Sequence, residues 1–191
     1  MKNIGLFFGS FNPIHIGHLI IANTMVEHAG LDEVWFVVSP QNPFKKQSSL
    51  LHEFDRLDLV NAAIFDNFNL KAVDVEFRMP KPSYTIDTLT YLSDEHKDKK
   101  FKLIIGEDNL KGFHKWKNAE KILEFYELLV YPRPNAQPSD LKTHPKVQLI
   151  EAPMMDISAT FIRKCVQNHK SIKYLVPESV EQLIIGRKLY M

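Results

Sequence analysis

Two histidines three positions apart, His15 and His18, end the most informative run of the chain, Gly9-Ser10-Phe11-Asn12-Pro13-Ile14-His15-Ile16-Gly17-His18. The run follows an apolar stretch over 4–8, which predicts a strand, and leads into a helical pattern. A strand that passes through such a loop into a helix gathers backbone amides and a helix N-terminus at one place, where proteins bind phosphate. Imidazole N–H groups there can donate hydrogen bonds to phosphoryl oxygens. The run therefore predicts a phosphate-binding loop.

This histidine loop differs from three common motifs. A Walker A loop would end in Gly-Lys-Ser or Gly-Lys-Thr, which does not occur here. The dinucleotide fingerprint needs three closely spaced glycines, whereas Gly9 and Gly17 stand eight positions apart with Pro13 between them. A zinc-binding helix carries histidines four positions apart, unlike His15 and His18. We therefore assign no protein ligand to a metal.

A second run, Ile157-Ser158-Ala159-Thr160-Phe161-Ile162-Arg163, predicts the start of a helix. Ser158 is a good N-cap residue, and Arg163 lies about one and a half turns further along. Its guanidinium could reach an anion held at that helix end. Taken alone, the run is more typical of a capped helix with a surface arginine.

Two further runs combine residues that shape the backbone with residues that could bind a ligand. In Lys81-Pro82-Ser83-Tyr84-Thr85, a Ser, Thr or Asp side chain is expected to cap the helix that follows. In Ile104-Ile105-Gly106-Glu107-Asp108, a strand ends at a glycine and is followed by carboxylates. Trp116 then either packs in the core or stacks on an aromatic ligand.

Apolar runs alternate with helical patterns along the chain, as is typical of an α/β protein with a parallel sheet. The expected strands cover 4–8, 33–39, 70–75, 101–105, 128–131 and 147–151. The expected helices cover 18–29, 53–65, 85–96, 119–125, 158–168 and 178–185. Because ligands bind at the carboxyl ends of parallel strands, the loops after 8, 39, 77 and 105 should surround one crevice.

Composition narrows the class of protein. With 191 residues, 45% of them hydrophobic, the chain can bury a full core, so we expect one domain over 1–191, with the C-terminal helices, about 157–191, packed on its edge. Its 24 basic and 23 acidic residues lack the excess expected of a nucleic-acid binder. The single cysteine, Cys165, cannot form an internal disulfide, and no apolar stretch approaches membrane-spanning length. We expect a cytoplasmic protein that does not bind a membrane.

The histidine loop resembles the (S/T)-F-(D/N)-P-x-H-x-G-H motif of the nucleotidyltransferase superfamily, and 157–163 resembles the I-S-(S/A)-T-x-x-R motif with which those enzymes hold the triphosphate of ATP. Three further elements narrow the resemblance to the bacterial nicotinate-nucleotide adenylyltransferase family. They are P-S-Y-T-x-x-T-L at 82–89, I-I-G-x-D-x-L at 104–110 with a following tryptophan, and Y-P-R-P at 131–134. The similarity runs from Asn3 to the C-terminus.

The resemblance implies a Rossmann-like, doubly wound parallel sheet and the transfer of AMP from ATP to nicotinate mononucleotide, which gives deamido-NAD and pyrophosphate in NAD biosynthesis. Such a transfer depends on positioning and charge neutralisation rather than on a protein nucleophile. The 5′-phosphate of the acceptor would attack the α-phosphorus of ATP in line. Mg²⁺ would bridge phosphate oxygens.

The resemblance also implies roles for particular residues. His15, His18 and Arg163 would stabilise charge on the transferred group, and Ser10 and Phe11 would act more through their backbone amides than through their side chains. The residues expected to bind ATP are Gly9, Ser10, Phe11, His15, His18, Gly106, Asp108, Ile157, Ser158, Thr160 and Arg163. The residues expected to bind nicotinate mononucleotide are Tyr84, Thr85, Asp108, Trp116, Lys45 and Arg133, with Trp116 or Tyr84 stacking on the ring and Thr85 taking its carboxylate.

The chain departs from the commonest family pattern at three places, the first of which is Ser10 in place of a frequent threonine. Asn12 replaces a frequent aspartate, and Phe44 stands where many relatives have a histidine, so only Lys45 and Lys46 are carried over there as phosphate contacts. Dual specificity for nicotinate and nicotinamide mononucleotides stays open. A phosphopantetheine or cytidylyl transferase would have no use for Tyr84 and Trp116, and a non-catalytic nucleotide-binding module should have lost His18 or Arg163. A homo-oligomer is compatible with the sequence.

Overall fold

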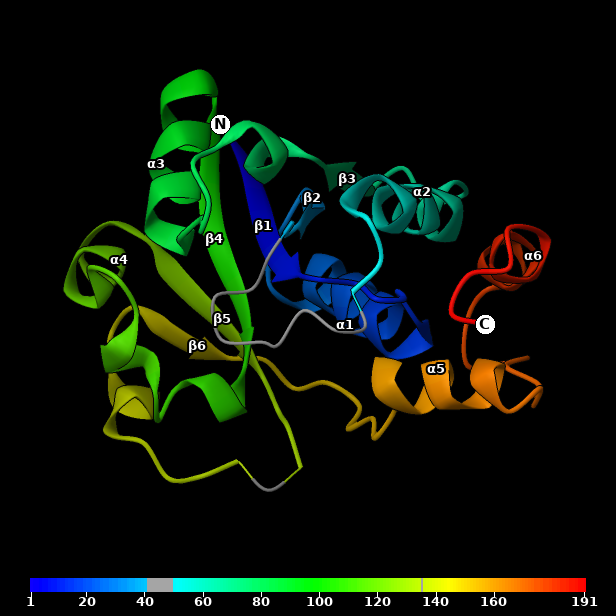
Figure 1. The fold of residues 1–191 in the computed structure, drawn as a ribbon. Coiled ribbons are helices and arrows are strands. Elements are labelled where there is room, and N and C mark those ends of the chain that lie inside the picture. The colour runs from blue at the N-terminus through cyan, green and yellow to red at the C-terminus, as the bar shows by residue number, and fades with distance from the viewer. Residues whose placement is uncertain (41–49, 135) are drawn as a thin grey trace.

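A single parallel sheet forms the centre of the computed structural model, which describes residues 1–40, 50–134 and 136–191 (Figure 1). Its six strands lie in the order β3-β2-β1-β4-β5-β6. They are β1 (Lys2–Gly9), β2 (Glu33–Val38), β3 (Leu70–Val73), β4 (Lys99–Gly106), β5 (Glu127–Tyr131) and β6 (Val147–Leu149). The proposed phosphate contacts Lys45 and Lys46 lie outside the described residues.

The strand order reverses between β1 and β4, which are adjacent and parallel. The chain continues from β1 to β2 on one side and from β4 to β5 on the other side. The loops that follow β1 and β4 therefore diverge and leave a crevice at the carboxyl ends of these strands. The histidine loop continues directly from β1, and Gly106 is the last residue of β4. The fold therefore brings together two of the runs recognised in the sequence.

Helices cover both faces of the sheet (Figure 1). One face packs against α1 (Ile16–His28), α2 (Glu53–Ile64), α5 (Ala159–Gln167) and α6 (Glu178–Gly186). The other face packs against α3 (Thr85–Glu95) and α4 (Ala119–Phe125). Every residue of β2 is buried because both of its faces are covered. The prediction of a doubly wound α/β sheet is confirmed.

The C-terminal helices contribute to the core. Ile162 on α5 and Ile184 on α6 are fully buried in the same cluster as the apolar side chains of α1 and α2, and Cys165 is buried with them. The assignment of one domain over 1–191 stays a prediction. No helix in the described part of the chain is both long and apolar enough to cross a membrane.

The strand expected over 70–75 is too long by two residues. β3 ends at Val73, and a 3₁₀ helix, η1 (Val75–Arg78), turns the buried side chain of Glu76 inward. Three other short 3₁₀ helices were not predicted, because a single turn leaves no periodic pattern. They are η2 (Glu107–Asn109), η3 (Phe113–Lys115) and η4 (Asp140–Thr143).

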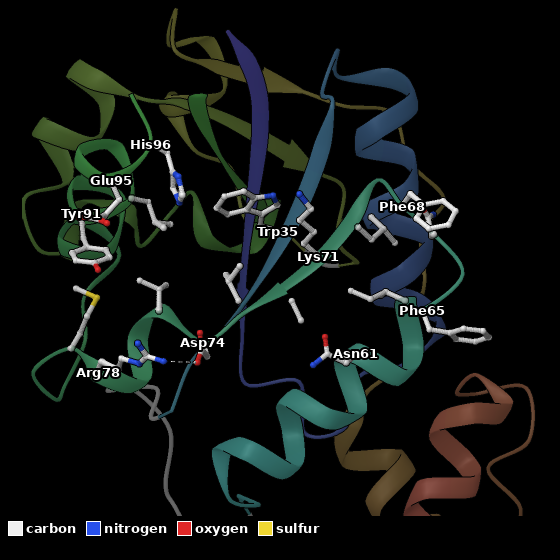
Figure 2. Close-up of a pocket in the computed structure, with 18 residues that line it drawn as sticks. Trp35, Asn61, Phe65, Phe68, Lys71, Asp74, Arg78, Tyr91, Glu95 and His96 are labelled. Atoms are coloured by element: carbon white, nitrogen blue, oxygen red, sulfur yellow. Dashed lines mark ion pairs between the residues drawn. The ribbon is translucent and has the colours of Figure 1, made fainter. Parts of the chain in front are cut away.

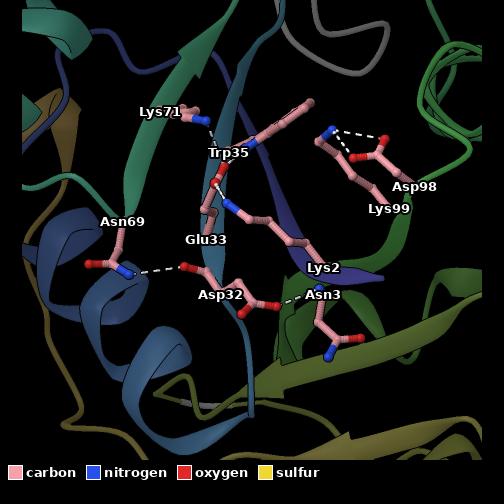
Figure 3. A network of polar contacts seen from close by, with 9 residues as sticks. All are labelled: Lys2, Asn3, Asp32, Glu33, Trp35, Asn69, Lys71, Asp98 and Lys99. Atoms are coloured by element: carbon pink, nitrogen blue, oxygen red, sulfur yellow. Dashed lines mark hydrogen bonds and ion pairs between the residues drawn. The ribbon is translucent and has the colours of Figure 1, made fainter.

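A polar network closes the end of the sheet opposite the crevice (Figure 3). The Glu33 carboxylate accepts hydrogen bonds from Lys2 Nζ at 3.0 Å and Trp35 Nε1 at 2.8 Å, and it forms an ion pair with Lys71 Nζ at 2.9 Å. Burial alone would raise the pKa of Glu33, but the hydrogen bonds from Trp35, Lys71 and Lys2 outweigh it and hold the pKa at about 2. This end of the sheet is thus held by satisfied polar groups.

Candidate active site

The two histidines of the loop form one stacked unit at the start of α1. Their ring centroids lie 3.7 Å apart with an interplanar angle of 24°. The backbone N–H of His15, the N-cap residue of α1, donates to Nδ1 of His18 at 3.3 Å. Because Nδ1 of His18 accepts this bond, a neutral His18 carries its proton on Nε2. His18 can therefore donate a hydrogen bond from the far side of its ring.

His15 is almost completely buried beside its partner ring, with 6% of its surface exposed. Burial, and then the positive charge of Arg133, lowers the pKa of His15 from 6.5 to about 4. The imidazole is therefore neutral near pH 7. Gly17 makes room for this ring, because a Cβ atom at position 17 would stand 3.1 Å from His15 Nδ1 and 3.2 Å from its Cε1. This close approach explains the glycine between the histidines.

The predicted helix start at Ser158 lies beside the histidine loop. Ser158 is the N-cap residue of α5 and its Oγ accepts from the Phe161 N–H at 3.2 Å, which confirms the predicted cap. Arg163 donates from Nη1 to the carbonyl oxygen of Asn12 at 2.7 Å and from Nη2 to Thr160 Oγ1 at 3.3 Å. The side chain thus extends to the histidine loop and joins the two predicted phosphate-binding runs. Ile157, which precedes the cap, packs against the core.

An ion pair between Arg133 and Asp108 lies near the histidines, beside the end of β4. Arg133 Nε and Asp108 Oδ1 are 3.8 Å apart, and both side chains are about half exposed. A Cβ atom on Gly106 would stand 2.5 Å from Asp108 Oδ1 and 3.0 Å from Arg133 Cγ. Since the Arg133 charge also acts on His15, the Tyr131-Pro132-Arg133-Pro134 run contributes to the histidine end of the crevice.

A cavity of about 220 Å³ opens next to these groups, between the ends of β1 and β4. Six of the predicted site residues line it: Gly9, Ser10, Tyr84, Thr85, Gly106 and Trp116. Phe11, His15, His18, Asp108, Arg133, Ile157, Ser158, Thr160 and Arg163 are outside its lining. The structure therefore separates the predicted residues into a cavity and an adjoining cluster of histidines and arginines.

Two of the aromatic residues that line the cavity, Tyr84 and Trp116, come from the start of α3 and from the turn after η3. Tyr84 is the N-cap residue of α3, and Lys117 Nζ lies 4.6 Å from the centroid of its ring. Trp116 is half-buried, and its ring centroid is 5.1 Å from that of Phe113. Trp116 both packs against the core and lines the cavity, so the two alternatives considered for it are compatible.

The expected side-chain cap of α3 is wrong. No side chain caps this helix. Two hydroxyl groups near its start, those of Ser83 before the helix and Thr88 in its first turns, bind Glu76 instead. Ser83 Oγ donates to Glu76 Oε2 at 2.9 Å, and Thr88 Oγ1 donates to Glu76 Oε1 at 2.8 Å. Glu76 is 2% exposed and lines the cavity. No local pattern marks this residue as functional, because its partners lie in another segment.

Arg56 on α2 is the second polar residue that sequence reasoning missed. It is fully buried, and its guanidinium donates to four backbone carbonyls: Leu51 at 2.9 Å, Ser10 at 2.5 Å, Ser39 at 2.8 Å and Pro40 at 3.1 Å. Burial lowers the pKa of Arg56 from its usual value. The residue ties the histidine loop to the end of β2 and to the start of α2.

A larger groove of about 760 Å³ lies along the edge strand β3, away from the predicted site residues (Figure 2). Trp35 and Lys71 form its floor, with Phe65 and Phe68 at one end and Tyr91 at the other. Within the described ranges, no cluster of three or more His, Cys, Asp or Glu side chains could hold a metal ion.

The doubly wound sheet, with stacked histidines at the strand-order reversal and an arginine from α5 joined to their loop, defines a nucleotidyltransferase. Residues 6–165 match the family model described as cytidylyltransferase-like. Full-length relatives are more specific. The chain is 63% identical over 187 residues to the protein named "Probable nicotinate-nucleotide adenylyltransferase" of Cytophaga hutchinsonii, covering 98% of this chain and 97% of that protein. It therefore belongs to the nicotinate-nucleotide adenylyltransferase family.

Other relatives agree with this assignment. The protein of the same name from Flavobacterium johnsoniae is 49% identical over 189 residues, with 98% of each chain covered. Among solved structures, the nicotinic acid mononucleotide adenylyltransferase of Plasmodium falciparum, complexed with NaAD, superposes with a TM-score of 0.83. It is 22% identical, and the match covers 100% of this chain and 98% of the other. That similarity shows a shared fold.

Proposed function

We propose that the chain transfers AMP from ATP to nicotinate mononucleotide, releasing pyrophosphate and forming deamido-NAD for NAD biosynthesis. The observation that carries the proposal is the 2.7 Å hydrogen bond from Arg163 to the Asn12 carbonyl, which joins both predicted phosphate-binding runs beside the cavity. Family membership supports the identity of the substrates.

In this mechanism the protein supplies position and charge. A 5′-phosphate oxygen of the acceptor attacks the α-phosphorus of ATP, the bond to the bridging oxygen breaks, and pyrophosphate leaves. His18 donates from Nε2 because its Nδ1 already accepts the His15 N–H. His15 acts as a neutral imidazole, and Arg163 supplies positive charge for the phosphates. We favour His18 as the more important histidine.

The ATP would lie along the cluster that joins the ends of β1 and β4 to the start of α5. The amides near Ser158 and Thr160, together with Arg163, would hold the β- and γ-phosphates. Gly9, Ser10, Phe11, Gly106 and Asp108 would contact the rest of the nucleotide, and Ile157 would act by packing below it. Mg²⁺ would be carried by the phosphate oxygens. The histidine and arginine side chains of the cluster suit this arrangement, because they offer N–H donors and not the oxygen ligands that Mg²⁺ prefers.

Nicotinate mononucleotide would place its ring in the 220 Å³ cavity. Tyr84 or Trp116 would stack on the ring, and Thr85 would take the carboxylate at the start of α3. Arg133 and Asp108, which lie at the histidine end, would contact the ribose and phosphate, and Lys45 stays a predicted phosphate contact. A cytoplasmic location and self-association stay predictions as well.

The test is pyrophosphate release from ATP and Mg²⁺ with nicotinate mononucleotide, nicotinamide mononucleotide or phosphopantetheine as the acceptor. We expect turnover with the first, and a fall of at least roughly 100-fold in His18→Ala. His28→Ala, an exposed histidine on the same helix, is the matched control and should keep full activity. Turnover with both pyridine nucleotides would establish dual specificity, and turnover with neither would contradict the proposal.

A further inference from the structure

The C-terminal end of the chain reaches the histidine loop. After α6, the N–H of Leu189 donates to the Ile184 carbonyl at 2.9 Å, and this turn brings the chain back toward β1. Tyr190 follows with φ of 64°. Its hydroxyl donates to Asn12 Oδ1 at 2.9 Å, although the two residues are 178 positions apart.

Asn12 is a junction between three segments. Its Oδ1 atom also accepts from the backbone N–H of Leu51 at 3.2 Å. Its carbonyl oxygen accepts from Arg163 at 2.7 Å. The hydroxyl of Tyr190 therefore holds the side chain of the same residue whose carbonyl holds Arg163.

The position of Tyr190 is fixed by contacts between α6 and α2. Arg187 Nη1 lies 2.7 Å from Asp58 Oδ2 and 3.5 Å from Asp55 Oδ1. Ser179 Oγ, in the first turn of α6, donates to the Ala62 carbonyl at 2.6 Å. Burial also raises the pKa of the Tyr190 hydroxyl above its ordinary value, so the hydroxyl stays protonated and able to donate near pH 7.

We propose that Tyr190 is a positioning residue of the active site, which orients Asn12 and thereby the Arg163 guanidinium. The inference rests on the proposed function, because its test measures the kinetics of that reaction. It extends that function to the end of the chain, outside residues 6–165 that match the family model.

The test compares full-length wild type with Tyr190→Phe, which removes the hydroxyl and keeps the ring. We expect the KM for ATP to rise and kcat/KM for ATP to fall roughly threefold to tenfold, the range for one hydrogen bond between uncharged groups. The KM for nicotinate mononucleotide should not change, because Asn12 is not part of the cavity lining. Tyr174→Phe is the matched control, since Tyr174 is 81% exposed.

Two results would overturn the inference. In the first, Tyr190→Phe has the kinetics of wild type. In the second, it lowers kcat/KM equally for both substrates together with the melting temperature, which is the behaviour of a residue needed only for folding. An inactive wild type would instead contradict the proposed function. In that case the shift in melting temperature on adding ATP would still report whether Tyr190→Phe weakens ATP binding.

The Asn12→Asp background tests whether the effect passes through position 12. A carboxylate accepts a hydrogen bond about twice as strongly as a neutral acceptor. The loss caused by Tyr190→Phe should therefore be larger in Asn12→Asp than in the wild type. An equal loss in both backgrounds would show that Tyr190 does not act through Asn12.

Discussion

Replacing Arg56 with methionine should destabilise the protein far more than the same replacement of the exposed Arg78. The guanidinium donates to the carbonyls of Ser10, Ser39, Pro40 and Leu51, so it holds together three segments: the histidine loop, the end of β2 and the start of α2. Methionine keeps much of the volume and removes every donor. The four carbonyls would then lose their partner at once.

The magnitude follows from these four bonds. A carbonyl left unpaired in the interior costs about 1–3 kcal/mol, and the lower value applies where water can enter. Only the bond to Pro40 is fully buried, and removing the charge recovers part of the cost of burying it. We therefore expect Arg56→Met to lower the free energy of unfolding by about 3 kcal/mol, or roughly 6–12 °C in melting temperature for a chain of this size. Arg56→Lys offers three donors from one atom and should lose about 2 kcal/mol.

Urea unfolding followed by circular dichroism measures these differences. The matched control is Arg78→Met, because the Arg78 side chain is 87% exposed and its ion pair with Asp74 is long, at 3.9 Å. This control should change the unfolding free energy by less than about 0.5 kcal/mol. If Arg56→Met is as stable as Arg78→Met, the guanidinium does not hold the three segments, and the reasoning fails.

Two further predictions concern the site. Burial and the Arg133 charge lower the pKa of His15 from 6.5 to about 4, so the unfolded chain binds a proton at a higher pH than the folded chain does. The folded state therefore loses stability relative to the unfolded state as the pH falls. This contribution, at most roughly 3 kcal/mol, is complete above pH 6.5 and is lost as the pH falls toward 4. His15→Asn should flatten the pH dependence of unfolding in that window, and an unchanged slope would contradict the assignment. Glu76→Leu removes the carboxylate that accepts from the Ser83 and Thr88 hydroxyls and should raise the KM for nicotinate mononucleotide about tenfold, whereas Glu76→Gln, which can still bind both, should stay near wild type. A parallel rise in the KM for ATP would contradict a role confined to the cavity.

The sequence was sufficient where the relevant signal is local. The continuous apolar run of β2 and the cap at Ser158 both lie within a few residues, and both were predicted. Arg56, Glu76 and Tyr190 could not be found in this way, since their bonds to the Ser10 carbonyl, Thr88 and Asn12 span 46, 12 and 178 positions. A buried polar residue that serves a distant segment looks like a surface residue until the segments are placed.

The two arginines that bind the histidine loop also explain how the loop can attract an anion. Arg56 and Arg163 donate to the carbonyl oxygens of Ser10 and Asn12, which satisfies N–H groups without cancelling either positive charge. In a trans peptide the carbonyl and the following N–H point in opposite directions. Because the Ser10 carbonyl points at Arg56, the N–H of Phe11 points away from that guanidinium. The contacts that order the loop therefore keep two guanidinium charges beside it, without a carboxylate in either of these two bonds.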